Sequence, residues 1–147
     1  MTKPFNIRVY GLLIHNNQVL VTDEFLMNME ITKFPGGGLE FGEGTIECII
    51  REFHEELNIP IKVEKHFYTT DFFVKSAFND TQVISIYYIV STENPEQIIT
   101  VDKPHQYTDK KNGAQIFRWI PLNKVNAFDF TFVIDQKVAE MLGKLNA

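Results

Sequence analysis

Residues 36–59 have the sequence GGGLEFGEGTIECIIREFHEELNI, and this stretch decides the fold. Its first half belongs to a segment, residues 32–44, that holds five glycines and Pro35. Such a density of glycine destabilises a helix interior, because each glycine loses more backbone freedom on ordering than other residues do. We therefore predict a loop over residues 32–44 that lets the backbone approach a ligand closely.

The second half of the stretch has the periodicity of a helix. Apolar residues recur at three- and four-residue spacing, which places them on one face, and they are Ile46, Ile49, Ile50, Phe53 and Leu57. Thr45 is the expected N-cap, and the helix should end near Asn58, just before Pro60. Cys48 is expected to be a small core or boundary residue, since no basic partner marks it as a nucleophile.

Three carboxylates share another face of this helix. Glu52, Glu55 and Glu56 fall within an arc of about 100° at helical spacing, away from the apolar stripe. Taken alone, a glutamate-rich face is usually only solvated surface. Crowded carboxylates are nevertheless stabilised by a cation, and hard oxygen ligands suit Mg²⁺ or Mn²⁺.

Loop and helix together resemble the Nudix box, the signature of the Nudix hydrolases. The matching positions are Gly37, Glu43, Arg51, Glu52, Phe53, Glu55, Glu56 and Ile59 at the spacing of that motif. Asn58 stands where the family has glycine, and asparagine is the next-best residue for a left-handed helix C-cap. The box covers about 23 residues, and the elements around it fit the family loosely.

The resemblance implies an α/β fold, a Nudix-type α/β/α sandwich with a mixed central sheet, in one domain over residues 1–147. It implies a Mg²⁺ site, with Mn²⁺ as a substitute ion. The implied metal ligands are Glu52, Glu55, Glu56 and the backbone carbonyl of Gly37. Arg51 and Glu43 would orient these carboxylates through charge-assisted hydrogen bonds.

Catalytic and substrate-binding residues follow from the same resemblance. The catalytic set is Glu55, Glu52, Arg51 and Glu43, with Glu55 favoured as the general base. Alternatives for the base lie in the polar segment 91–111, and they are Glu93, Glu96 and His105. The residues expected to bind substrate are Gly37, Gly38, Lys33 and Phe34.

The rest of the chain supplies further elements. Residues 7–14 and 18–25 are β-rich and separated by Asn16-Asn17, which predicts a hairpin. The other predicted elements are strands at 61–74, 82–90 and 115–120, a long loop at 91–111, and a helix at 130–145. The last helix should bury a stripe made of Val133, Ile134, Val138, Met141 and Leu142.

The composition of the chain limits the kinds of molecule that it is expected to bind. The chain has 147 residues and a net charge of −5, which disfavours binding to nucleic acid or to an anionic membrane. With one cysteine, no intramolecular disulfide and no thiolate-rich zinc site can form. A cytoplasmic location is the expectation, because no signal-peptide stretch is present. Apolar edge strands and the family resemblance make a homodimer compatible with the sequence.

The function implied is hydrolysis of a diphosphate linkage in a nucleoside diphosphate linked to another moiety. The alternative is a non-catalytic Nudix-fold sensor of a nucleotide or sugar phosphate, and the complete set of box carboxylates favours the enzyme. Substrate choice stays open. The arginine that many relatives carry after the second strand is replaced by residues 22–25, TDEF, and Val74 stands where ADP-ribose hydrolases often have proline.

Overall fold

The computed structural model describes residues 4–145, and their contacts divide the chain into two compact units. The first unit comprises the described residues up to Leu12 together with Gly36–Glu93. The second comprises Leu13–Pro35 and the described residues from Asn94 onward. The chain passes from one unit to the other inside strand β1 (Phe5–His15), and each unit is described by itself.

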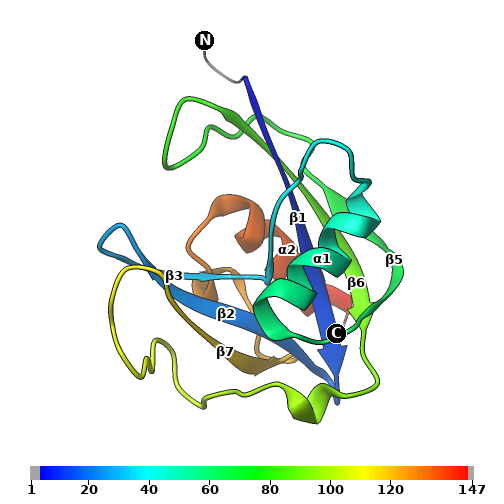
Figure 1. The fold of residues 1–147 in the computed structure, drawn as a ribbon, viewed down its shortest axis with the longest axis vertical. Helices are drawn as coiled ribbons and strands as arrows, with labels where there is room; N and C mark the ends of the chain where they lie inside the picture. Colours follow the sequence, from blue (N-terminus) through cyan, green and yellow to red (C-terminus); the bar gives the residue numbers. More distant parts are fainter. Residues whose placement is uncertain (1–3, 146–147) are drawn as a thin grey trace. The chain divides into compact units, whose positions relative to one another are not determined.

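The first unit is built around the first part of β1. The short strand β4 (Gly36–Gly38) pairs antiparallel with it, and β6 (Gln82–Ser91) is its other neighbour. The Gln82 amide donates to the Pro4 carbonyl at 2.8 Å, so β1 and β6 begin at the same end and run parallel (Figure 1). Strand β5 (Lys62–Thr69) pairs antiparallel with β6. The sheet is therefore mixed, as predicted.

Helix α1 (Thr45–Leu57) buries one of its faces in the first unit. Cys48, Ile49 and Phe53 are completely buried. A Cβ at Gly11 of β1 would lie only 2.4 Å from the Phe53 ring, so the helix packs directly on this glycine. The predicted apolar stripe was too wide, because Ile46 and Ile50 are 48% and 40% exposed. The buried face is centred where Gly11 leaves room for the Phe53 ring.

The ends of α1 confirm one predicted cap and correct the other. Asn58 is the C-cap in the left-handed conformation, with φ 54° and ψ 38°, as expected. Gly44 is the N-cap, whereas Thr45 was predicted, and the Glu47 carboxylate accepts the Gly44 amide at 2.8 Å. The Thr45 hydroxyl lies 2.6 Å from the Tyr88 hydroxyl, and this hydrogen bond links α1 to β6.

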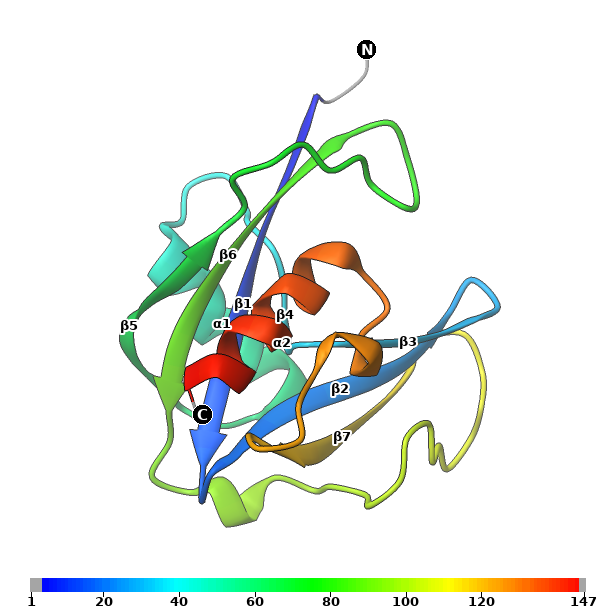
Figure 2. The ribbon, with the colours of Figure 1, turned by 180° about the vertical axis from the view of Figure 1, so that it is seen from behind.

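The second unit contains a three-stranded antiparallel sheet with β2 at its centre. Strand β2 (Gln18–Leu26) lies between β3 (Met29–Lys33) and β7 (Ala114–Pro121), antiparallel to both (Figure 2). Asn16 and Asn17 form the predicted hairpin turn with φ of 51° and 58°. The prediction of a continuous loop over residues 32–44 was wrong at its start, because β3 extends to Lys33 and the glycines form β4.

Short 3-10 helices and a last helix complete the second unit. They are η1 (Pro95–Gln97), η2 (Ala127–Asp129) and α2 (Val133–Leu145). Ile134, Val138 and Leu142 are buried as predicted, but Val133 is 51% exposed because it occupies the first turn of the helix.

A buried ion pair joins the strands of the second unit. Asp23 of β2 is fully buried, and both of its carboxylate oxygens accept from the Arg118 guanidinium of β7, at 2.7 and 3.2 Å. Burial raises the pKa of the Asp23 carboxyl, but bonds from Arg118, Thr32 and the His105 amide outweigh it and hold that pKa below its usual value. The His105 amide, 3.1 Å from Asp23, anchors the long polar segment to this pair.

We predict that Asp23→Asn lowers the free energy of unfolding by about 3–5 kcal/mol, because it leaves the Arg118 charge buried and uncompensated. The lowered pKa of Asp23 means that its stabilisation is complete above about pH 3.9, the unfolded-chain value, and is lost as pH falls through the folded value. Urea unfolding between pH 7 and pH 2 measures both effects. Asp109→Asn is the control, since that side chain is 73% exposed, and an equal loss in the two variants would contradict the prediction.

Candidate active site

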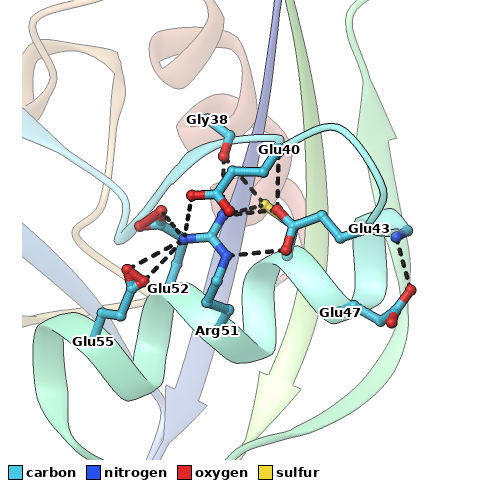
Figure 3. Close-up of polar contacts among 9 residues, drawn as sticks. Gly38, Glu40, Glu43, Glu47, Arg51, Glu52 and Glu55 are labelled. Carbon is cyan, nitrogen blue, oxygen red and sulfur yellow. Dashed lines mark hydrogen bonds and ion pairs between the residues drawn. The ribbon is translucent and has the colours of Figure 1, made fainter.

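Arg51 lies at the centre of a group of carboxylates in the first unit (Figure 3). Its Nε and Nη2 atoms donate to the two Glu43 oxygens at 2.9 and 2.7 Å. Its Nη1 atom donates to Glu52 at 3.0 Å and to both Glu55 oxygens at 3.0 and 3.3 Å. Nη2 also donates to the Gly38 carbonyl at 3.1 Å, which ties the helix to the glycine strand. The structure thus brings together five residues that the sequence singled out.

The electrostatics of this group separate Glu43 from the other carboxylates. Hydrogen bonds from Arg51 lower the pKa of Glu43 to about 2, and the carboxylates together raise the pKa of Arg51. Glu43 and Arg51 therefore stay charged over the whole physiological range. Burial raises the pKa of the Cys48 thiol to about 12, so Cys48 is a protonated core residue, as its position in the sequence suggested.

Gly37 is needed because the Glu52 carboxylate lies against it. A Cβ built on Gly37 would fall 2.5 to 2.6 Å from the two Glu52 oxygens and their carbon. Real side chains never approach so closely, so glycine is the residue that fits here. The backbone of β4 and the carboxylate of α1 therefore meet at one place. The oxygens at this place are those of the Glu52 carboxylate and of the β4 peptide groups.

Glu55 and Glu56 differ in exposure. The Glu55 side chain is 52% exposed, whereas Glu56 is half-buried and its Oε2 atom is buried. Among residues 4–145, no three acidic, histidine or cysteine side chains converge closely enough to enclose an ion as they stand. The positive charge that lies among the box carboxylates is that of the Arg51 guanidinium. Glu40, which the sequence did not single out, adds an oxygen 3.7 Å from Arg51 Nη1.

Lys33 and Phe34, predicted to bind substrate, belong to the second unit. The Lys33 ammonium pairs with Glu24 at 3.2 Å, and its side chain is only 11% exposed. The Phe34 side chain is completely buried, with its ring centroid 4.4 Å from that of Phe130. Phe34 is thus a core residue, and its ring presents no surface to a substrate.

The alternative bases lie in different settings. Glu93 and Glu96 are exposed. His105 is held inside the second unit, with Nδ1 2.9 Å from the Tyr107 hydroxyl and Nε2 3.4 Å from the Thr32 hydroxyl. Its backbone is also left-handed, with φ 55°. Glu55 is the candidate base that lies among the box carboxylates of the first unit.

Comparison with known proteins gives the family. A sequence profile described as the NUDIX domain matches residues 4–141, and the chain therefore belongs to that family. It is a Nudix hydrolase, from a family of pyrophosphohydrolases that typically depend on divalent metal and act on small phosphate substrates. A comparison with curated proteins gives no match.

Solved structures agree on the fold. The chain is similar to a MutT protein from Methanosarcina mazei Go1 (TM-score 0.70, 18% identity, 99% of this chain and 98% of that chain). It is also similar to a NUDIX hydrolase from Nitrosomonas europaea (TM-score 0.68, 18% identity, 98% and 90%). A third is an ADP-ribose pyrophosphatase from Streptococcus suis (TM-score 0.58, 13% identity, 93% and 86%). The predicted α/β Nudix fold is confirmed. In the described part of the chain, no helix has the length and apolar character needed to cross a membrane.

We predict that Arg51→Gln raises the pKa of Glu43 from about 2 toward its ordinary value of about 4.3, because the bond that lowers it is lost. Carboxyl-carbon NMR titration measures this value directly. Lys62→Gln removes the same charge from a side chain that is 79% exposed on β5, and it should leave Glu43 unchanged. A Glu43 titration that stays near pH 2 in Arg51→Gln would refute the assignment.

Proposed function

We propose that this Nudix hydrolase cleaves a diphosphate linkage in a nucleoside diphosphate linked to another moiety, with Mg²⁺ or Mn²⁺ bound by Glu52, Glu55, Glu56 and the Gly37 carbonyl. The observation that supports this most is the contact of the Glu52 carboxylate with the bare backbone of Gly37. A carboxylate beside a peptide group is a hard-oxygen donor set of the kind these ions prefer.

The other proposed donors are carboxylates of the same helix. Glu56 turns one oxygen into a buried position, and Glu55 offers a half-exposed carboxylate one turn from Arg51. When bound, the ion would supply Lewis acidity and lower the pKa of a water molecule. A cation would also relieve the like-charge crowding that only Arg51 offsets in the contacts described above.

The remaining residues act through position and charge. Glu43 accepts two bonds from Arg51 and thereby fixes the guanidinium, which in turn orients Glu52. Glu55 is our candidate for the base that takes a proton from the attacking water, because its side chain is accessible and lies beside the other box carboxylates. Glu43 and Arg51 are positioning residues in this scheme.

The substrate class also draws on the similar structures. Their titles include an ADP-ribose pyrophosphatase and a UDP-X diphosphatase, and these names describe those proteins. Nucleoside diphosphate derivatives, together with nucleoside triphosphates and dinucleoside polyphosphates, are therefore the compounds to test. At identities of 13% the choice among them has to come from experiment.

We predict that the wild-type protein with Mg²⁺ or Mn²⁺ releases nucleoside monophosphate, phosphate or pyrophosphate from at least one such compound, and that chelation stops the reaction. Glu55→Gln and Glu56→Gln should each lower turnover more than about 100-fold, since losing a direct ligand costs more than losing an outer partner. Glu47→Gln is the control, because it keeps an acceptor for the Gly44 amide. Tight binding of a compound without turnover would favour the sensor.

We also predict that Gly37→Ala weakens Mn²⁺ binding at least about 10-fold, because the new methyl group displaces the Glu52 carboxylate. Gly38→Ala is the matched control, since its Cβ would meet its nearest atom at an ordinary 3.7 Å. Titration calorimetry with Mn²⁺ measures both affinities without any substrate. Equal Mn²⁺ affinity in the two variants would show that Glu52 is not a ligand.

A further inference from the structure

Arg8 of β1 lies beside the glycine strand in the first unit. It is the register partner of Gly38, across the antiparallel pair of β1 and β4. A Cβ built on Gly38 would lie 3.7 Å from Arg8 Nη1, and no other atom would come within 4 Å. The Arg8 guanidinium is therefore the nearest neighbour of the Gly38 side-chain position.

The two faces of this strand pair carry opposite charges. Residues alternate between faces along a strand, so Arg8 and Tyr10 lie opposite Gly11, which faces Phe53 of α1. Gly37 is next to Glu52 on the helix side, and Gly38 is next to Arg8 on the other side. Because β4 consists of three glycines, no side chain of β4 lies between the Glu52 carboxylate and the Arg8 guanidinium.

The Arg8 side chain is held in place by aromatic residues. Its Nε atom donates to the Tyr10 hydroxyl at 2.6 Å, and its guanidinium lies 5.7 Å from the Tyr10 ring centroid. The Tyr10 ring packs on the Tyr87 ring at 5.3 Å, and both rings are buried. A long side chain that is already ordered loses little entropy when it binds a ligand.

A basic group at this position is electrostatically favourable for binding an anion. Residues 40–56 contain six glutamates and a single arginine. That arginine, Arg51, directs its donors to carboxylates and to the Gly38 carbonyl. An anionic substrate that approaches β4 is repelled by the glutamates, so a second cation next to Gly38 favours its binding.

We propose that Arg8 is a substrate-binding residue whose guanidinium holds a phosphate group of the substrate beside Gly38, on the opposite side of β4 from the Glu52 carboxylate. The inference rests on the proposed function, because it assumes a substrate with a phosphate group near the glycine strand. A planar guanidinium binds two phosphate oxygens at once, which a lysine ammonium cannot do.

Kinetics on the compound that the wild type hydrolyses test this role. Arg8→Ala should raise KM about 10- to 100-fold while kcat stays within a few-fold, because the bond is made equally in the ground and transition states. Arg8→Lys should recover part of the loss, since it restores the charge without the bidentate geometry. Lys62→Ala removes the same charge from β5 and should leave KM unchanged. An unchanged KM in Arg8→Ala would overturn the proposal.

Binding of inorganic pyrophosphate in the absence of divalent metal gives a readout independent of turnover. By titration calorimetry, Arg8→Ala should bind at least about 10-fold more weakly than the wild type or Lys62→Ala. Equal affinities, or no binding by the wild type, would overturn the role of Arg8 even if the enzyme is active. A lack of hydrolysis across all compounds would instead refute the proposed function, and the pyrophosphate result would still decide on Arg8.

Discussion

The structure of the box depends on one cation among crowded carboxylates. Glu43, Glu52 and Glu55 all direct oxygens at the Arg51 guanidinium. Like charges at helical spacing destabilise a helix, and Arg51 removes that cost while its bond to the Gly38 carbonyl fixes the helix to β4. The same set of bonds thus stabilises the helix and places its acidic face. The fold of the box and the geometry of the candidate site therefore depend on the same bonds from Arg51.

The second constraint is the glycine strand β4, where the lack of room for a side chain, rather than charge, determines which residue fits. Gly36 has φ 152°, and a Cβ there would lie 2.1 Å from the Val9 carbonyl oxygen. At Gly37 the obstacle is the Glu52 carboxylate. At these two positions a side chain would clash, so only glycine lets the backbone of β4 pack this closely against Val9 and Glu52. The Glu52 carboxylate and the Arg8 guanidinium lie on opposite faces of this one strand.

The sequence predicted what local spacing determines and missed what tertiary contacts decide. The helix, its Asn58 cap and the shared face of Glu52, Glu55 and Glu56 depend on residues close together in the sequence, whereas the role of Arg51 came only from the family resemblance. The pairing of Asp23 with Arg118 joins residues 95 apart, and no local pattern reveals it. Exposure of Ile46 and the strand character of three glycines likewise depend on neighbours across the sheet. The pairing of Arg8 with Gly38 and of Tyr10 with Gly36 likewise becomes visible only from the strand register.

Differences among the Arg51 partners determine which carboxylate changes partner most easily. Glu43 accepts two bonds from Arg51, and its pKa of about 2 keeps that pair intact at any physiological pH. Glu55 makes an exposed pair, and pairs of that kind contribute only about 0.2–1 kcal/mol. A divalent ion bound as proposed would offer a carboxylate far more than this, so Glu55 would leave Arg51 at little cost while Glu43 would retain the guanidinium. Arg51 therefore stays in place to orient Glu52 whether or not Glu55 remains bound to it, which is the property that a positioning residue needs.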